Sequence, residues 1–444
     1  MSRLTVDPSG THLRLGEAFF PLIMDTAWSS FADPSEEEWR SYLATRRRQG
    51  FTCVAVSVLP ILHDRDERAG SRDPFALDAV GHPDFDRPDE GYFAQAREFT
   101  RIAHEEYDLR LLLVVLWNNY VPGTWAAART PYAVMADKHR RAYVERVART
   151  FGDLEPIFAV GGDDNYRVPE ANAAYLEAAA QLRDVAPSCL LTTHSAPHAD
   201  LPDDLAGALD FFCHQSGHDA RNVDLTWQQA APYLARSPRK PLLAAEPAYE
   251  QHGRVNGHGR WTRDDVRRAS WTSVLAGAAA GIGYGAHGMW MWHSPSARFT
   301  SGGSSLEPYP WQVALGFPGA LDISLMARLF TDHRLYRLTP AQDLLADRAG
   351  DGVEGGVEGS GADEPGAGEV LRLGASPDRD LVVLYLPYSR DAEVLVDLRV
   401  HRLTGWDLAE RAPLTVDPVF GDGRTRLRQL PSLGDQLVVA ERTA

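Results

Sequence analysis

Short apolar runs alternate with longer amphipathic stretches up to about residue 330 of the chain. Eight of these runs are nearly continuous apolar segments, a pattern typical of parallel strands buried on both faces. Each run turns polar or aromatic at its C-terminal end. The predicted strands lie at residues 19–28, 51–59, 109–117, 157–164, 189–197, 209–218, 241–250 and 281–292.

The segments between these runs have helical periodicity. Ser35 precedes three glutamates, and Thr262 is followed closely by two aspartates. Acidic residues in a first turn suit the positive end of a helix dipole, so both sites predict a helix start. We expect further helices at residues 92–107, 139–151, 169–185 and 227–234, and a last one that ends near residue 330.

Eight strands that alternate with helices predict an α/β protein with a (β/α)8 TIM barrel. A doubly wound open sheet is the alternative fold. The sequence favours the barrel, because no G-x-G-x-x-G motif follows the first strand. We expect the barrel to occupy residues 19–335.

The pattern differs at the two ends of the chain. Residues 1–18 predict a β-hairpin that either pairs with the C-terminal part or covers the floor of the barrel. Residues 346–368 are mainly Gly, Asp, Glu and Ala, a composition that buries little apolar area, so we expect a flexible acidic linker. Short alternating runs in residues 369–444 predict a small β-sandwich domain.

Composition excludes several classes of protein. The 444 residues are 44% hydrophobic and 24% charged, which allows a sizeable core and excludes general disorder and a fibrous form. The 61 acidic residues outnumber the 45 lysines and arginines, and the net charge of −16 opposes binding to nucleic acid or to an anionic membrane. A small, neutral or weakly polar substrate fits better.

Three cysteines, Cys53, Cys189 and Cys213, each lie in an apolar run, so we expect reduced thiols in the core. The first residues do not resemble a signal peptide, and no run of 18 apolar residues occurs. We therefore expect a soluble, cytoplasmic protein. Its oligomeric state is left open.

Barrel enzymes of this kind build their active site at the C-terminal ends of the strands. The residues that end the eight runs are carboxylates, amides, imidazoles and indoles. This set is typical of a sugar pocket, in which aromatic faces cover the C–H face of a ring and polar groups bind its hydroxyls. The candidates are Asp25, Trp28, Trp117, Asn118, Asp163, His194, Gln215, His218, Glu246, Tyr249, His287, Trp290 and Trp292.

Each candidate also has a plainer interpretation. A carboxylate at a strand end is often a helix cap or an ion-pair partner, and a histidine or tryptophan there often serves packing alone. Trp290 and Trp292 are two residues apart, so we expect them to face the same way, either into the pocket or into the core.

Two of the carboxylates have the placement that glycoside hydrolysis needs. Asp163 ends the fourth run and Glu246 ends the seventh, so they should face each other across the barrel mouth. In glycoside hydrolysis one such group protonates the leaving oxygen, and the other attacks the anomeric carbon or activates water. The preceding Gly161-Gly162 favours Asp163 as the inward group, and strand alternation should turn Asp164 away.

Seven motifs resemble, in the same order, those of the apiosidase-like glycoside hydrolases, glycoside hydrolase family 140 and its relatives. They are Asp25-Thr26-Ala27-Trp28, Arg48-Gln49-Gly50-Phe51, Glu90-Gly91-Tyr92-Phe93, Gly161-Gly162-Asp163, Gln215-Ser216-Gly217-His218, Glu246-Pro247-Ala248-Tyr249-Glu250 and Tyr284-Gly285-Ala286-His287-Gly288-Met289-Trp290. The tail around Gly405-Trp406-Asp407 resembles the small, collagen-binding-type β-domain that usually follows.

The resemblance implies a (β/α)8 barrel that cleaves glycosidic bonds of furanose-type sugars, such as apiose or arabinofuranose. It further implies a retaining mechanism with Asp163 as the general acid/base and Glu246 as the nucleophile. The expected enzyme is exo-acting, uses no metal or cofactor, and acts on a small carbohydrate or glycoside.

Two other functions remain open. A metal-dependent barrel hydrolase would use histidines near the strand ends, although no His-x-His motif occurs in the chain. These histidines are His194, His198, His214, His218, His287 and His293. A non-catalytic carbohydrate-binding protein would keep the pocket without the chemistry.

Overall fold

Eight parallel strands form a closed barrel in the order β4-β5-β9-β10-β11-β12-β13-β14. The computed structural model describes residues 3–67, 70–300, 306–346 and 370–443. Every residue of the barrel strands is buried except Asp163. This confirms the predicted TIM barrel. The bounds are β4 (Leu22–Thr26), β5 (Cys53–Ser57), β9 (Arg110–Trp117), β10 (Ile157–Asp164), β11 (Leu191–Ser195), β12 (Phe212–Gln215), β13 (Leu242–Glu246) and β14 (Gly281–Tyr284).

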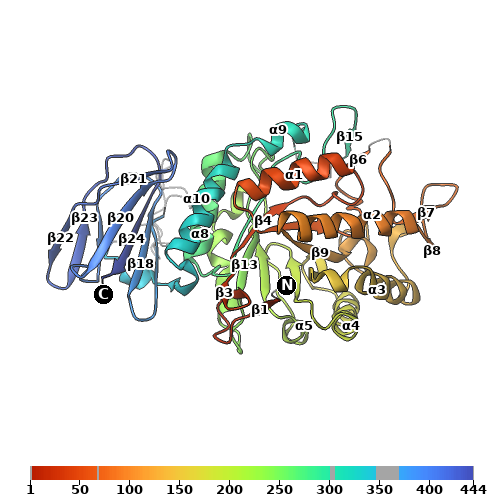
Figure 1. Ribbon diagram of the computed structural model, residues 1–444, viewed down its shortest axis with the longest axis horizontal. Coiled ribbons are helices and arrows are strands. Elements are labelled where there is room, and N and C mark those ends of the chain that lie inside the picture. Colours follow the sequence, from red (N-terminus) through yellow and green to blue (C-terminus); the bar gives the residue numbers. More distant parts are fainter. Residues whose placement is uncertain (1–2, 68–69, 301–305, 347–369, 444) are drawn as a thin grey trace, which may run out of the picture.

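Helices surround the barrel, as Figure 1 shows. Both predicted start signals are confirmed, because Ser35 and Thr262 each cap a helix through a reciprocal side-chain and backbone hydrogen-bond pair. The helix predicted at 92–107 starts at Glu90, and the segment 227–234 divides into two short helices. The helices are α1 (Glu36–Arg48), α2 (Glu90–Arg101), α3 (Asp137–Phe151), α4 (Pro169–Val185), α5 (Asp203–Ala208), α6 (Leu225–Gln228), α7 (Ala230–Leu234), α8 (Arg263–Leu275), α9 (Trp311–Leu315) and α10 (Gly319–Asp332).

One helical stretch of the described residues, Trp311–Asp332, is long and apolar enough to be compared with a membrane span. A break between α9 and α10 interrupts it. Met326 and Phe330 are buried against the barrel, so this stretch belongs to the core of the fold.

The N-terminal residues form a small antiparallel sheet of β1 (Leu4–Val6), β2 (Leu13–Leu15) and β3 (Ala18–Phe19). Arg3 Nε donates a hydrogen bond to the carbonyl of Ser188, just before β11 begins, at 3.0 Å. Phe19 stacks on Phe330 of α10. The sequence left open whether these residues pair with the C-terminal part or cover the barrel floor. In the structure the sheet lies at the barrel floor.

Residues beyond α10 form two antiparallel sheets with a core of their own. The larger sheet has the order β16-β17-β18-β24-β20-β21 and the smaller one β19-β23-β22. The predicted linker, except for Ala346, lies outside the described residues. The bounds are β16 (Thr339–Pro340), β17 (Arg372–Ala375), β18 (Leu381–Leu386), β19 (Ala392–Val394), β20 (His401–Asp407), β21 (Ala412–Leu414), β22 (Pro418–Gly421), β23 (Arg424–Leu427) and β24 (Gln436–Arg442).

Loops of the barrel contain two further sheets that the hydrophobic pattern did not predict. β6 (Arg65–Glu67) pairs with β15 (Arg298–Thr300), and β7 (Phe75–Leu77) pairs with β8 (Pro83–Pro88). The first of these pairs joins the loop after β5 to the loop after β14. In the closed barrel, β5 and β14 lie on either side of β4.

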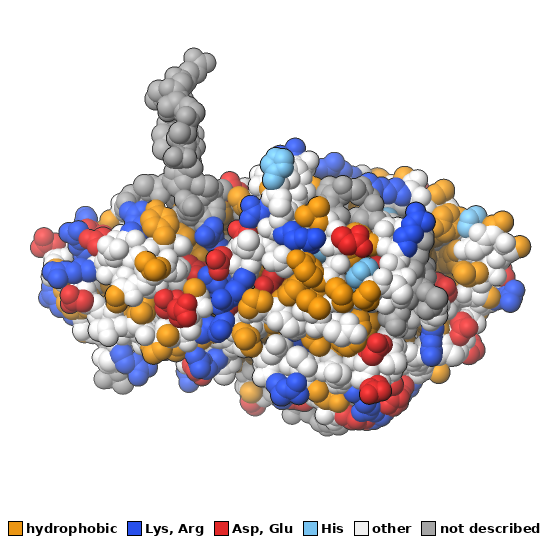
Figure 2. Space-filling view, turned by 90° about the horizontal axis from the view of Figure 1, so that it is seen from above, with side chains coloured by type: hydrophobic (Ala, Val, Ile, Leu, Met, Phe, Trp, Pro, Cys, Tyr) orange, Lys and Arg blue, Asp and Glu red, His pale blue; other side chains and the backbone are white. Residues whose placement is uncertain are grey.

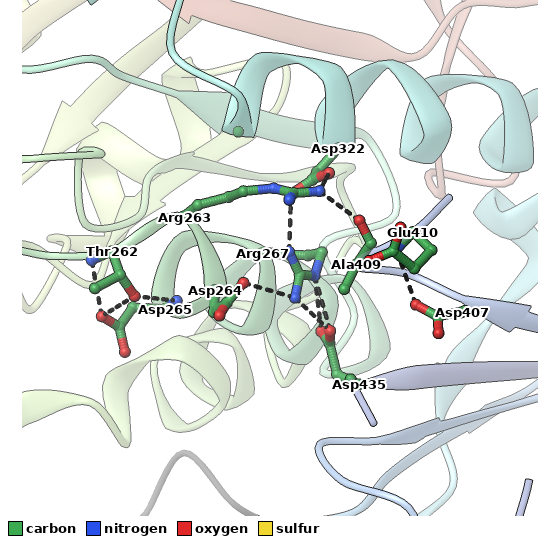
Figure 3. A network of polar contacts seen from close by, with 12 residues as sticks. Thr262, Arg263, Asp264, Asp265, Arg267, Asp322, Asp407, Ala409, Glu410 and Asp435 are labelled. Carbon is green, nitrogen blue, oxygen red and sulfur yellow. Dashed lines mark hydrogen bonds and ion pairs between the residues drawn. The ribbon is translucent and has the colours of Figure 1, made fainter. Parts of the chain in front are cut away.

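A network of buried charges joins the barrel to the β-domain, with α8 and α10 facing the larger sheet (Figures 1 and 3). Arg267 of α8 donates to Asp435 of the β-domain at 2.5 Å and to Asp322 of α10 at 2.9 Å. Asp322 also accepts from Arg263 and from Arg411 of the β-domain. Since Arg267, Asp322 and Asp435 are all buried, each charge depends on its partners across the interface.

Candidate active site

A cavity of about 260 Å³ lies at the C-terminal ends of the barrel strands. Seen from above, the barrel half of the molecule carries hydrophobic side chains gathered around acidic and histidine side chains (Figure 2). Nine of the predicted site residues line the cavity: Trp28, Trp117, Asp163, His194, Gln215, His218, Glu246, Tyr249 and Trp290.

The end of β10 is shaped to present Asp163. A Cβ atom on Gly161 would lie 2.6 Å from the ring of Tyr175, and one on Gly162 would lie 2.5 Å from the ring of Trp117. Asp163 itself has φ +54°, a left-handed conformation that aspartate tolerates better than most residues. The pairing of β10 with β11 is irregular at this point, which changes the direction of the strand end.

Asn118 holds the backbone of Asp163 in this conformation. Its Nδ2 donates to the carbonyl oxygen of Asp163 at 2.6 Å, and Trp125 Nε1 donates to the same oxygen at 3.1 Å. Asn118 was expected to bind substrate, but it is buried and does not line the cavity. Its contact with the sugar site is therefore indirect, through Asp163.

The carboxyl group of Asp163 has a high proton affinity. Burial, and then the nearby charge of Glu246, raises its pKa to about 7. Gln215 Nε2 donates to Asp163 Oδ1 at 2.6 Å, which opposes the shift without cancelling it. Asp163 thus keeps its proton up to nearly neutral pH.

Glu246 at the end of β13 has the opposite electrostatic environment. His194 Nε2 lies 3.1 Å from Glu246 Oε2, and His218 Nε2 lies 3.0 Å from Oε1. Burial raises the pKa of Glu246, but the hydrogen bonds and the electrostatic attraction of the two histidines outweigh burial and hold its pKa well below the usual range. Between the two pKa values, Glu246 is therefore an ionised carboxylate while Asp163 keeps its proton.

Aromatic side chains complete the cavity wall. The ring centroids of Trp28 and Trp117 are 5.2 Å apart, and Trp28 lies 5.3 Å from His194. Tyr249 contacts Trp290 at 6.4 Å on another part of the wall. Such flat apolar faces suit the C–H face of a sugar ring.

Asp25 was expected in the pocket, and the structure places it elsewhere. It is fully buried, and its Oδ2 accepts hydrogen bonds from Tyr42 and from Arg46 of α1, both at 2.6 Å. Arg46 is also fully buried and needs a carboxylate partner, so Asp25 neutralises it beneath the cavity.

The expectation that Trp290 and Trp292 face the same way is wrong. Both lie in the turn after β14, where the two-residue alternation of a strand does not apply, and Trp292 has φ +55°. Trp290 lines the cavity, whereas Trp292 packs against Trp311 and the α1 residue Trp39. His287 also lies behind the wall rather than in it, because its ring nitrogens bond to Leu306 and Trp290.

Several lining residues were missed by the sequence reasoning. They come from loops beyond the strand ends and include His63, Asp64, Asp219 and His252. His63 and Asp64 follow the second run by only four or five residues, which was the one available signal. Asp219 and His252 lie in loops, one and two residues after the sixth and seventh runs end, so the same signal was available for them.

The metal-dependent alternative requires at least three ligands that converge. Among the described residues, no group of three or more histidine, cysteine, aspartate or glutamate side chains is arranged to hold a metal ion. The two cavity histidines His194 and His218 instead bond to Glu246. All three cysteines are buried free thiols, as predicted from their apolar surroundings.

Comparisons with known proteins agree with this fold. The structure resembles a glycoside hydrolase with a TM-score of 0.78 at 18% identity, covering 100% of this chain and 97% of the other. It also resembles a glycoside hydrolase family 5 protein from Bacteroides vulgatus ATCC 8482, with a TM-score of 0.78 at 19% identity over 99% and 93% of the two chains. A family 5 mannosidase from Rhizomucor miehei matches at a TM-score of 0.51 and 10% identity, over 76% and 98%. At such identities these likenesses show the fold.

No curated protein matches the sequence. The family model described as apiosidase-like, catalytic domain, matches residues 10–337, which is most of the chain and ends before the β-domain. The resemblance of the β-domain to a collagen-binding type stays a prediction. The chain belongs to the apiosidase-like family and is a glycoside hydrolase.

Proposed function

We propose that this enzyme is a retaining, exo-acting glycosidase that removes a terminal furanose-type sugar from a small glycoside. Asp163 is the general acid/base and Glu246 the nucleophile. The observation that carries the proposal is the opposite displacement of two pKa values in one cavity, upward at Asp163 and downward at Glu246. An acid and a nucleophile of this reaction need such a difference.

The first step uses both groups as they stand. Asp163 donates its proton to the glycosidic oxygen while Glu246 attacks the anomeric carbon, so the aglycone leaves as an alcohol and a glycosyl ester forms on Glu246. Formation of the ester removes the charge of Glu246, which is one cause of the high pKa of Asp163. The pKa of Asp163 then falls, and the ionised carboxylate can take a proton from water.

In the second step, the water activated by Asp163 attacks the anomeric carbon and releases Glu246 as a carboxylate. The sugar leaves with its original anomeric configuration, and Asp163 is protonated again. The histidines that bond to Glu246 stabilise the released carboxylate, because hydrogen bonds to a charged group are among the stronger ones.

The size of the cavity supports an exo-acting enzyme. Its volume of about 260 Å³ lies just below the usual range for small-molecule sites, which is roughly 300–1,000 Å³. A cavity of this size suits a single sugar ring, with the scissile bond at the mouth of the cavity. The furanose form of that sugar is supported by membership of the apiosidase-like family, because apiose is a furanose-type sugar.

A screen of aryl furanosides and aryl pyranosides tests the proposal. We expect release of the aryl group from a furanoside, and proton NMR should show a product with retained configuration. A crystal structure should place the two carboxyl groups about 5–5.5 Å apart, whereas about 6.5–9.5 Å would indicate inversion. If no glycoside is cleaved or bound, the catalytic proposal fails; binding without cleavage would indicate a carbohydrate-binding protein.

Variants at the two carboxylates test the roles. Asp163→Asn and Glu246→Gln should each lower kcat by at least about 100-fold, since general acid catalysis alone contributes about 10²–10⁴. Asp164→Asn is the matched control, because Asp164 is buried next to Asp163 but does not line the cavity. Full activity in both active-site variants would contradict the assignment.

A further inference from the structure

Three histidine rings lie in a row behind the nucleophile. His218 bonds to Glu246, and its ring stacks on His252 with 4.2 Å between centroids and 23° between planes. His252 in turn contacts the edge of His287 at 4.7 Å. Only the first of these rings touches Glu246, so the second has no role in the reaction scheme above.

Hydrogen bonds define which nitrogen of each outer ring carries a proton. The backbone N–H of Tyr249 donates to His218 Nδ1 at 3.3 Å, so the proton of a neutral His218 is on Nε2 and points at Glu246. His287 Nδ1 accepts from Trp290 Nε1 at 3.3 Å, which leaves its Nε2 to donate to the carbonyl of Leu306 at 2.5 Å.

The middle ring is fixed in the same way. His252 Nδ1 lies 2.7 Å from the carbonyl oxygen of Gly253 and donates to it. Burial, and then the neighbouring rings of His218 and His287, lowers the pKa of His252 well below its usual value. Burial also lowers the pKa of His287 to about 3. His252 and His287 are therefore neutral rings, and His252 can stack on His218 without charge repulsion.

We propose that His252 is a positioning residue for the nucleophile: its ring, stacked on His218, holds that imidazole at the angle at which Nε2–H points at Glu246. The inference rests on the proposed role of Glu246 and adds a residue that does not touch the reacting atoms. It also gives a role to a loop residue that is 4% exposed and lies beside the cavity.

The physical reason lies in the torsion of the imidazole. Rotation of a histidine ring about its last bond has broad, shallow minima, so contacts on the ring faces decide its plane. His218 has Tyr249 tilted against it at 4.6 Å and His252 stacked in parallel at 4.2 Å, and the side chain also reaches the cavity. Without His252, the stacking surface is lost and the ring can turn away from Glu246.

A turned His218 would leave Glu246 Oε1 without its donor. The carboxylate then loses one of the two contacts that fix it, and a misplacement of about 1 Å at a reacting group can lower the rate about 100-fold. Substrate binding depends mainly on other parts of the wall, such as Trp28 and Trp117. A defect in positioning should therefore lower kcat more than it changes KM.

The experiment compares His252→Ala with His252→Phe on the aryl glycoside that the native enzyme cleaves best. We expect His252→Ala to lower kcat about tenfold or more, with KM within about twofold, because the stacking surface is lost. His252→Phe keeps a flat ring and should retain kcat within about threefold. Histidine-selective ¹⁵N NMR should show the Nε2–H form of His218 in the native enzyme and in His252→Phe, but a mixture of forms in His252→Ala.

His214→Ala is the control for general loss of stability, because His214 is buried on β12 outside the row and truncation of its side chain leaves a cavity. It should lower the melting temperature without the change in kcat or in the NMR signature. Equal defects in His252→Phe and His252→Ala, or unchanged kcat in His252→Ala, would overturn the proposal. If the native enzyme cleaves no glycoside, the proposed function fails, and the NMR comparison still decides whether His252 orients His218.

Discussion

Replacement of Asp163 by asparagine should make the enzyme inactive and, above neutral pH, more stable. The change keeps the shape of the side chain and an oxygen that accepts from Gln215 Nε2, but it removes the charge and the transferable proton. The native carboxyl group is surrounded by protein and faces the charge of Glu246, so its ionised form is unfavourable in the folded state.

The pKa of Asp163 gives the size of this penalty. Its folded value is about 7, compared with 3.8 for the unperturbed group, a difference of about 3 pH units at about 1.36 kcal/mol each. Because the folded pKa is raised, the stability contribution is most favourable below pH 4 and is lost as the pH rises through 7. The free-energy penalty that Asp163 imposes on the folded state is about 4 kcal/mol at pH 8 and only about 1.6 kcal/mol at pH 5. These are upper values, because Asp163 is partly exposed to the cavity.

Thermal unfolding of the native enzyme, Asp163→Asn and Asp164→Asn at pH 5 and pH 8 measures the effect. We expect the advantage of Asp163→Asn over the native enzyme to grow by up to about 3 kcal/mol between the two pH values. The charge of Glu246 is not among the causes that raise the pKa of Asp164. Asp164→Asn should therefore show a smaller change of stability with pH. An advantage of Asp163→Asn that does not depend on pH would refute the reasoning.

Four further outcomes follow from the same contacts. The kcat/KM of the native enzyme should fall as the pH rises through about 7, since Asp163 of the free enzyme must be protonated; a kcat/KM that stays constant to pH 9 would contradict this. His194→Phe removes a donor to Glu246 and should raise the pKa of Glu246 and lower kcat about 10- to 100-fold, as expected for a hydrogen bond to a charged group; the pH–rate profile measures both. Arg267→Met leaves Asp322 and Asp435 buried without a shared partner and should cost about 3–5 kcal/mol in unfolding free energy, whereas the exposed pair in Arg402→Met should cost below about 1 kcal/mol. Prolonged dialysis against a chelator should leave the rate unchanged; a loss that added metal restores would favour the metal-dependent alternative.

The barrel was predictable because its strands are buried on both faces, which leaves nearly continuous apolar runs in the sequence. The site was partly predictable for a related reason. A strand that ends at the barrel mouth can place a polar residue at the cavity, as those that carry Asp163 and Glu246 do. The two catalytic candidates therefore come from a geometric rule that needs only the strand ends.

The rule fails where the chain is no longer a strand or where another element needs the polar group. Asp25 stands at a strand end, but the buried Arg46 of α1 takes its carboxylate. Trp292 lies in a turn and itself has a left-handed backbone conformation, so its spacing from Trp290 carries no information about the direction of its side chain. His252 lies in a loop, and its position depends on contacts with His218 and His287 that no local pattern records.

The difference in pKa between the two carboxylates likewise depends on residues that are distant in sequence. Gln215 and Asp163 are 52 positions apart in sequence, and so are His194 and Glu246. Two imidazoles bond to Glu246 and lower its pKa, whereas the single amide that bonds to Asp163 does not offset burial and the charge of Glu246. Placement at the strand ends therefore makes Asp163 and Glu246 candidates. Their different surroundings, which include partners on β11 and β12 and in the loop after β12, give them the different pKa values that the proposed roles need.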